Sequence, residues 1–366
     1  MRMQLMRLVK YLQLNPNRNM NYIKILVTGV GGGVGQSIMK ALRISKLPIK
    51  IIAADINPLN AGLYRSDKAI IVPRVENKNA LSWYLKNLDK HKVNILMVGS
   101  EYDLLFFSRN KKIIERNTNC KICVSNVETI KISEDKFLTQ EFLKKNHIPY
   151  LKTFIPRNAE HAIAITKKLG LPVFFKSRFG TSSRNVYLIK NLSDIKSLFR
   201  FVSKPIIQEY AGFYSENGLN HEYTCSFFTT SNKKIIGPFV AKRKLLHGTS
   251  WIAEVRNFPK IKPIIKKIAN NLKNTGSMNI QLRLGPKGPV PFEFNARFSG
   301  TTSIRAHFGF NEPEMYIKSY LLKEKIKQPK IKRGISLRYI EEIFLENKNY
   351  INIGKKFYKG KINKWL

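Results

Sequence analysis

A glycine-rich turn between two apolar segments constrains the fold of this chain more than any other feature. Residues 29–35 contain five glycines and lie between a strand-like run and a helical apolar pattern. Strand, turn, helix and strand in this order form a βαβ unit, which implies a parallel sheet. The strand-like runs of this region are 23–28, 49–54, 95–98 and 121–124. We therefore predict an α/β fold with a mostly parallel, Rossmann-like sheet in the first third of the chain.

The glycine turn permits two interpretations. Glycines at every third position, with Asp55 closing the next strand, suit a dinucleotide-binding turn at a helix N-terminus. Close packing of the helix on the strand explains the same glycines. A short-chain dehydrogenase would also need a Tyr-x-x-x-Lys pair well downstream, and the chain offers only Tyr64 and Lys68, nine residues past Asp55. We favour packing and keep an NAD(P)-binding oxidoreductase as an alternative.

The charge of the chain is unusual. Its 366 residues include 65 Lys and Arg against 24 Asp and Glu, a net charge of +41. Such a field attracts polyanions, so a protein that binds nucleic acid or a membrane surface is a second alternative. The excess is spread along the chain, however, and a dedicated binding arm would concentrate it. We attribute it to compositional drift and expect no specific nucleic-acid partner.

The apolar runs and the cysteines of the chain argue against a membrane-spanning protein and against a disulfide-stapled secreted one. No apolar run approaches the roughly 18 residues of a membrane span. Three cysteines are too few for a disulfide-stapled secreted scaffold, so we expect a cytoplasmic protein. Cys120 and Cys123 have redox or zinc spacing, but a strand would point their sulfurs to opposite faces. We predict that both are buried core residues.

The second region contains a lysine suited to phosphate binding. Lys176 ends an apolar strand that begins at Pro172, and a turn of small residues follows it. The lysine can neutralise phosphate charge while the turn offers backbone N–H groups. Capping residues at 133–136 predict a helix over 137–145 just upstream.

The most specific pattern lies near residue 293. Glu293, Asn295 and Arg297 alternate with apolar or small residues, so their side chains share one face of a strand. Gln281 can face them from the preceding strand, which a turn at 286–288 would join to this one. A carboxylate and two amide oxygens are hard ligands that suit Mg²⁺. An arginine on the same face can clamp a phosphate.

Together these residues resemble the ATP-grasp superfamily, in the branch like the carbamoyl-phosphate synthase large subunit and the pyrrolysine-biosynthesis ligase. The resemblance spans about residues 23–340 and is strongest over 292–302, continuing to Arg305. It implies a Rossmann-like pre-ATP-grasp domain that binds acceptor substrate, then an ATP-grasp fold of two α+β subdomains. We expect a basic extension at 1–20 with Met20 as an alternative start, and domains at 21–130 and 131–322. The second domain would contain a lid at about 151–206, and 323–366 would form a basic C-terminal segment.

The resemblance also implies roles for individual residues. Lys136 and Lys176 would contact ATP phosphates, and the hinge residues Gln208, Glu209, Tyr210 and Ala211 would bind the adenine. Glu222 would hold the ribose, and Gln281, Glu293 and Asn295 would hold Mg²⁺ or Mn²⁺. Arg297 would stabilise the transferring phosphoryl group. Position and charge make Arg243 and Arg305 candidates to bind the substrate carboxylate or the acyl phosphate.

The implied reaction is ATP-dependent ligation of a carboxylate to an amine through an acyl phosphate, with release of ADP and phosphate. Small molecules or peptides are the expected substrates, and a homodimer is one option that the resemblance leaves open. The chain departs from the family pattern at Arg184-Asn185, in a longer segment at 212–221, and at Cys225-Ser226 where an aspartate is common. None of these changes touches the strand with Glu293, so we expect an active enzyme.

Overall fold

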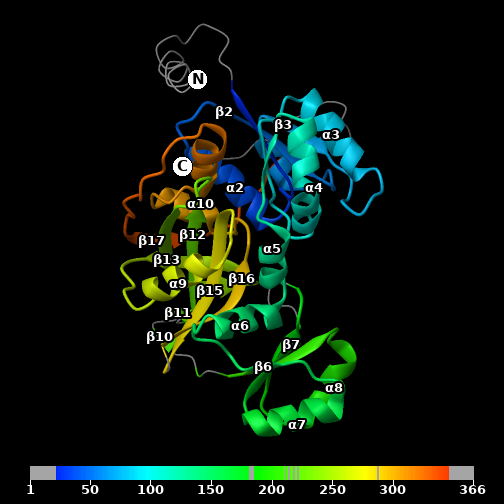
Figure 1. The fold of residues 1–366 in the computed structure, drawn as a ribbon, viewed down its shortest axis with the longest axis vertical. Coiled ribbons are helices and arrows are strands. Elements are labelled where there is room, and N and C mark those ends of the chain that lie inside the picture. Colours follow the sequence, from blue (N-terminus) through cyan, green and yellow to red (C-terminus); the bar gives the residue numbers. More distant parts are fainter. Residues whose placement is uncertain are drawn as a thin grey trace.

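The computed structural model contains three sheets of four or more strands and one two-stranded sheet, arranged along an elongated molecule (Figure 1). It describes residues 22–180, 185–210, 212, 215–216, 219–220, 222–286 and 288–345. The predicted basic extension at 1–20 and the part of the C-terminal segment after residue 345 lie outside the described residues. Among the helices within these ranges, none is long and apolar enough to cross a membrane.

The first sheet is parallel and has five strands in the order β3-β2-β1-β4-β5. Its strands are β1 (Ile23–Val27), β2 (Ile49–Asp55), β3 (Lys68–Ile71), β4 (Ile95–Met97) and β5 (Lys121–Cys123). The connecting helices are α2 (Gly33–Ile44), the short η1 (Ala61–Arg65), α3 (Ala80–Lys90) and α4 (Leu104–Asn117). The predicted βαβ start and mostly parallel sheet are confirmed. The strand order reverses between β1 and β4, so a crevice opens at the carboxyl ends of these strands.

Two short helices lead out of the first sheet, α5 (Val127–Glu134) and α6 (Lys136–Lys145). The N-cap of α6 is Asp135, whose carboxylate accepts hydrogen bonds from the backbone of Phe137 and Leu138. Ser133 lies in α5 instead, so its predicted part in capping the second helix was wrong. This capping fixes Lys136 at the first position of α6.

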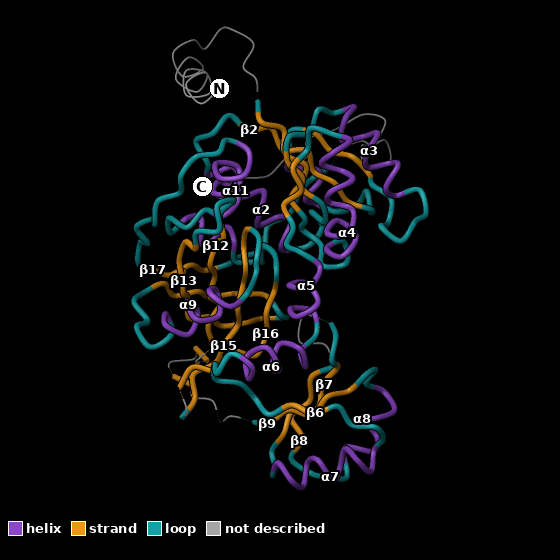
Figure 2. Tube along the Cα trace, viewed as in Figure 1, coloured by secondary structure: helices purple, strands orange, loops and turns teal. Residues whose placement is uncertain are grey.

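The second sheet forms a small unit that projects from the rest of the molecule (Figure 2). Its order is β6-β9-β7-β8, with β6 (Thr153–Phe154), β7 (Val173–Ser177), β8 (Val186–Ile189) and β9 (Pro205–Glu209). Two helices pack on it, α7 (Ala159–Leu169) and α8 (Asp194–Phe201), around a separate apolar core. We call this unit the lid, since it covers most of the range predicted for one.

The third sheet has six strands in the order β16-β15-β12-β13-β14-β17 and is antiparallel. The strands are β12 (Glu222–Thr229), β13 (Ile235–Leu246), β14 (Thr249–Val255), β15 (Gly276–Gly285), β16 (Gly288–Asn295) and β17 (Gly334–Leu337). A small hairpin, β10 (Ser215–Glu216) with β11 (Leu219–Asn220), precedes it. The accompanying helices are α9 (Lys262–Asn271), α10 (Thr302–His307), α11 (Glu312–Tyr316) and the π-helical turn η2 (Ile317–Leu321). The second half is therefore α+β, as predicted.

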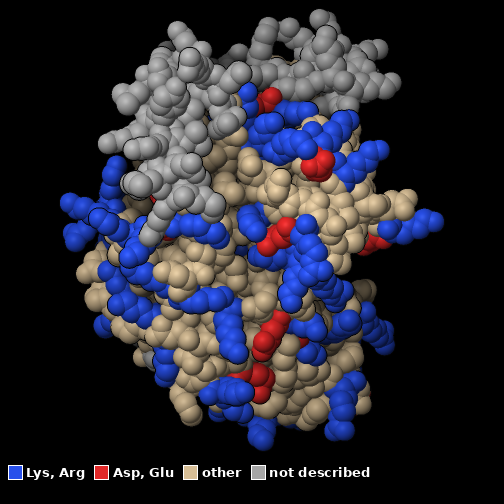
Figure 3. All heavy atoms as spheres, turned by 45° about the horizontal axis from the view of Figure 1, so that its top comes forward, with Lys and Arg blue, Asp and Glu red and all other residues tan. Residues whose placement is uncertain are grey.

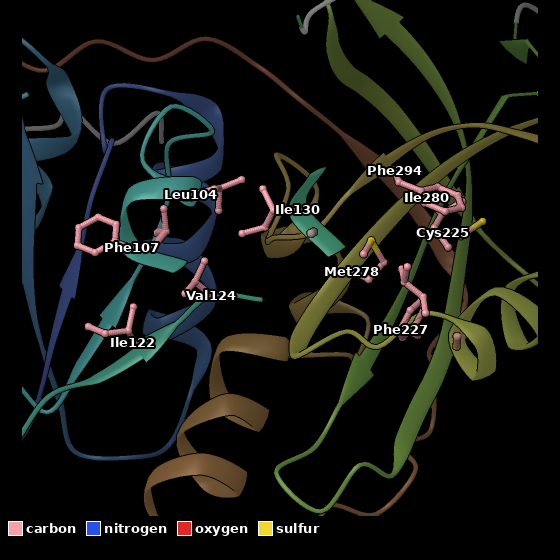
Figure 4. Close-up of a cluster of buried hydrophobic side chains, with 14 of the residues drawn as sticks. Leu104, Phe107, Ile122, Val124, Ile130, Cys225, Phe227, Met278, Ile280 and Phe294 are labelled. Carbon is pink, nitrogen blue, oxygen red and sulfur yellow. The ribbon is translucent and has the colours of Figure 1, made fainter. Parts of the chain in front are cut away.

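One apolar core joins the first and third sheets (Figure 4). It runs from Phe107 and Ile122 through Ile130 of α5 to Met278 and Phe294. Helices α10 and α11 add a second connection because they pack against α2. The two larger parts of the molecule therefore face each other in a fixed arrangement.

The cysteine pair follows the prediction. Cys120 and Cys123 are both buried and belong to two different apolar clusters, one on each side of β5. Burial raises the pKa of both thiols. Neither sulfur therefore has thiolate character, and redox or metal chemistry at this pair is not supported.

Candidate active site

The predicted metal ligands lie together on neighbouring strands. Gln281 of β15 is paired directly with Glu293 of β16, and its Nε2 donates to Glu293 Oε1 over 3.2 Å. The Nδ2 of Asn295 donates to the same oxygen over 3.1 Å. One carboxylate and two amides are thus close enough to share a hard cation, with remaining positions left for phosphate oxygens and water. The described residues contain no cluster of three or more Asp, Glu, His or Cys that could hold a metal.

A bulge in β16 sets the orientation of these ligands. Gln281 pairs with Glu293 but Leu282 pairs with Pro291, so Phe292 is an extra residue between them. Bulges re-aim side chains next to functional sites. The guanidinium of Arg283 lies 5.2 Å from the centre of the Phe292 ring. The strand alternation was predictable, whereas the bulge carries no signal in the sequence.

Arg243 links the metal-ligand set to Glu222. Its Nη2 donates to Gln281 Oε1 and to Glu222 Oε1, each over 2.7 Å. The Nε of Arg283 donates to the other oxygen of Glu222 over 2.9 Å. Burial favours protonation of Glu222, but the two guanidiniums prevail and hold its pKa below the usual value. In this arrangement Glu222 is an ion-paired anion, and its contact with a ribose stays a prediction.

Arg297 forms an ion pair with Glu101, which follows β4 of the first sheet. Its Nη1 also donates to the carbonyl of Phe298 over 2.8 Å. Burial lowers the pKa of Arg297 to about 10. Glu101 is a residue that the sequence analysis missed as a site candidate. Its position just beyond the carboxyl end of a parallel strand was the available signal.

A cavity of about 850 Å³ separates the first and third sheets. One wall consists of the loops that follow β1, β2, β3 and β4. The opposite wall includes Arg243, Gln281, Glu293, Asn295 and Arg297. Five predicted site residues therefore face one space together with the crevice of the Rossmann-like sheet.

Lys136 and Lys176 approach the same strand from the lid side. Lys136 lines a second cavity of about 330 Å³ with Glu293, Asn295 and Gly180, and its Nζ donates to the Gly180 carbonyl over 2.6 Å. Lys176 is buried, and desolvation, reinforced by the charge of Lys136 and opposed by Glu293, lowers its pKa to about 7. The two lysines and Glu293 thus form one electrostatic cluster, as phosphate binding would require.

Two family models match the chain. Residues 24–122 match the PylC-like N-terminal domain, and residues 219–343 match the family described as ATP-grasp in the biosynthetic pathway with Ter operon. A solved N5-carboxyaminoimidazole synthetase from Staphylococcus aureus, complexed with ADP, superposes with a TM-score of 0.66. It is 16% identical and the match covers 88% of this chain and 82% of that one. The chain has the ATP-grasp fold.

Curated relatives agree with this assignment and confirm the predicted resemblance. A carbamoyl-phosphate synthase from Methanobrevibacter smithii is 20% identical over 250 residues, which are 67% of this chain and 63% of that protein. A coenzyme gamma-F420-2:alpha-L-glutamate ligase from Methanocaldococcus jannaschii is 30% identical over 100 residues, 26% of this chain and 34% of that protein. The chain thus spans less than two thirds of the length of these relatives.

The segment predicted to bind adenine is only partly described by the structure. Gln208 is buried, accepts from Lys176 Nζ over 2.7 Å and donates to Thr153 over 2.8 Å. Its amide holds Lys176 in this structure, and its contact with nucleotide stays a prediction. Glu209 and Tyr210 line neither of the two cavities above, and Ala211 lies outside the described residues. The predicted adenine contacts of this segment stay predictions.

Arg305 does not reach the site, which corrects its proposed role in substrate binding. Its side chain is fully buried, and its Nε donates to Glu312 Oε2 over 2.7 Å. Glu312 Oε1 in turn accepts from Ser226 and Ser277. The remaining donors of Arg305 reach Asn279, Ser299, Thr301 and Thr302. This network ties α10 and α11 to the third sheet, so Arg305 is a structural residue.

The glycine turn packs helix α2 closely onto the first sheet, and its exposed residues Gly32 and Gly33 also line the large cavity. A Cβ on Gly35 would lie 2.4 Å from the Gly29 carbonyl oxygen, so helix and strand meet too closely for any other residue. The Asp55 carboxylate accepts from the Gly31 backbone over 2.7 Å and from Asn60 Nδ2 over 2.6 Å. A Cβ on Gly31 would lie 2.2 Å from Asn60 Nδ2, so Asn60 also requires glycine at this position. These contacts argue against the NAD(P) alternative.

Proposed function

We propose that this chain is an ATP- and Mg²⁺-dependent carboxylate–amine ligase that forms an acyl phosphate and releases ADP and phosphate. The observation that carries the proposal is the hydrogen-bonded set of Gln281, Glu293 and Asn295 at the boundary of two cavities. One cavity adjoins Lys136, and the other opens onto the first sheet. This arrangement suits a nucleotide on one side of the metal and substrates on the other.

Catalysis would consist of positioning and charge neutralisation. Mg²⁺ held by Gln281, Glu293 and Asn295 would supply positive charge at the phosphate oxygens. Lys136 and Lys176 would neutralise the phosphates from the lid side. Arg297 would leave its ion pair with Glu101 and bind the transferring phosphoryl group, where it would stabilise the developing negative charge. Arg243 would orient the side chain of Gln281. The larger cavity would exclude water from the acyl phosphate until the amine attacks.

The findings favour this function over a polyanion-binding one. Lys and Arg side chains are distributed across the face in Figure 3 and do not follow a single stripe. The relatives include a synthetase crystallised with ADP and a glutamate ligase, which agree with a nucleotide-dependent ligation. A cytoplasmic location and a homodimer remain parts of the proposal.

The test is a screen of the full chain with MgATP against paired carboxylates and amines, with ADP release as the readout. Hydroxylamine traps an acyl phosphate as a hydroxamate and identifies the carboxylate independently of the amine. Glu293→Gln should lower turnover by at least about a hundredfold. Glu160→Gln, an exposed residue of α7 in the lid, is the matched control. ADP release that Glu293→Gln leaves unchanged would refute the proposal.

A further inference from the structure

A buried ion pair joins the lid to the helix that precedes it. Arg178 follows β7 of the lid, and its Nε and Nη2 donate to the two carboxylate oxygens of Asp135 over 2.8 and 2.6 Å. Asp135 is 4% exposed and is the N-cap of α6, which lies outside the lid (Figure 1). A two-point contact between a guanidinium and a carboxylate fixes the orientation of both groups. The end of β7 is therefore held to the start of α6.

Three further contacts strengthen this junction. The backbone N–H of Lys136 donates to the Arg178 carbonyl over 3.1 Å. The Arg178 guanidinium lies 5.5 Å from the centre of the Phe137 ring on α6 and 5.3 Å from that of Phe179 beside β7. Aromatic faces attract a guanidinium at such distances. Arg178 therefore contacts residues on both sides of the junction.

Lys136 lies at this junction because it directly follows Asp135. It is the first residue of α6, and its Nζ donates to the carbonyl of Gly180, just beyond Arg178, over 2.6 Å. Lys136 and Lys176 carry like charges, and the charge of Lys136 helps to lower the pKa of Lys176. The two side chains therefore repel each other when no phosphate is bound. The pair of Asp135 and Arg178 opposes their separation, since it ties the backbone next to one lysine to the backbone near the other.

We propose that Arg178 is a positioning residue, which holds Lys136 at the nucleotide phosphates through its ion pair with Asp135. The inference rests on the proposed function in one respect, the contact of Lys136 with phosphate. Two nitrogens of Arg178 are already bound to Asp135, so the arginine acts through Lys136 and not as a phosphate ligand itself. The ion pair thereby keeps Lys136 and Lys176 together at the boundary between the lid and the rest of the molecule.

Calorimetric titration of the full chain with MgATP tests this inference in a double-mutant cycle. Arg178→Gln should weaken MgATP binding about fivefold, since Lys136 then has to be ordered as the nucleotide binds. Lys136→Met should weaken it about thirtyfold, because a charged hydrogen-bond donor to phosphate is lost. The double variant should bind within about twofold of Lys136→Met, since without the lysine nothing is left to position. Independent effects would instead multiply to about 150-fold.

Asp135→Asn separates the ion pair from helix capping. Asparagine caps a helix as well as aspartate does, so α6 should keep its start while the charge that binds Arg178 is lost. This variant should weaken MgATP binding as much as Arg178→Gln does, and combining the two should weaken it no further. Arg200→Gln removes an exposed arginine from α8 of the lid. It is the matched control and should bind MgATP as tightly as wild type does.

Effects of Arg178→Gln and Lys136→Met that multiply would overturn the inference, because neither a direct phosphate contact of Arg178 nor a general loosening of the lid depends on Lys136. Unchanged MgATP binding in either single variant would overturn it as well. If Arg178→Gln does not fold, as judged by circular dichroism, Asp135→Asn completes the same cycle with Lys136→Met. The ligase proposal fails separately, in ADP release that Glu293→Gln leaves unchanged, and MgATP binding that follows the cycle would then still support the role of Arg178.

Discussion

At the residue scale, the protonation state of Lys176 should depend on whether phosphates are bound. Its pKa of about 7 follows first from burial, so at pH 7 the side chain is about half protonated. Bound phosphates would favour the charged form and raise that pKa. We predict that MgATP binding at pH 7 takes up about half a proton per site. Calorimetry in buffers of different ionisation enthalpy measures this uptake. An uptake that persists in Lys176→Met would show that another group is responsible.

Glu222 illustrates the opposite case, an acid stabilised by its neighbours. Two guanidiniums contact Glu222 and lower its pKa below the unfolded-state pKa near 4.5. The stabilisation from these contacts is therefore fully present above pH 4.5 and is lost as the pH falls through the lower pKa of the folded state. We predict that Glu222→Gln lowers the free energy of unfolding by about 3 kcal/mol at pH 7, because it removes the anion that neutralises the buried Arg243 and also pairs with Arg283.

Urea unfolding measures this effect, and the loss should shrink well below pH 4.5. Glu254→Gln is the matched control, since Glu254 pairs with the more exposed Arg256 at 3.4 Å and should cost under about 1 kcal/mol. Equal costs for the two replacements would contradict the burial argument.

At the element scale, the first turn of α2 contains one glycine that close packing requires, Gly35, and one that alanine could replace, Gly33. A Cβ on Gly33 would meet nothing within 4 Å, whereas one on Gly35 would meet the Gly29 backbone. Gly33→Ala should therefore raise the free energy of unfolding by about 0.5–1 kcal/mol, through helix propensity and a less flexible unfolded chain. Gly35→Ala should lower it by at least about 2 kcal/mol. Chemical denaturation of both variants tests the pair. Similar effects at both positions would argue against tight helix–strand packing.

The elements themselves were largely predictable from the sequence. The βαβ start and the strand pair around Glu293 follow from period-two and period-3.6 patterns, which depend only on neighbouring residues. The exact capping residue was harder to predict from the sequence, because Asp135 caps α6 and Ser133 does not. The bulge at Phe292 was not predictable, since two strands must pair before an extra residue has any meaning.

At the scale of the whole molecule, long-range contacts decided which predicted residues share a site. Alternation along one strand brought Glu293 and Asn295 together, and pairing added Gln281. Arg305 looked equally suitable, but Glu312 and the sheet enclose it. Glu101 contacts Arg297 although the two residues are 196 positions apart in the sequence, and no local pattern in either segment predicts this contact. Charge and position therefore identify candidates, and only the packing of domains selects among them.

The central claim is that Gln281, Glu293 and Asn295 hold Mg²⁺ for a bound ATP. Calorimetric titration of the full chain with ATP, with and without Mg²⁺, on wild type and Glu293→Gln tests it most directly, with NADH as the comparison ligand. We predict that Mg²⁺ tightens ATP binding to wild type at least about tenfold. Glu293→Gln should abolish this gain, because the neutral amide oxygens that remain bind Mg²⁺ poorly without a carboxylate. ATP binding indifferent to both Mg²⁺ and Glu293, or NADH binding in its place, would contradict the account.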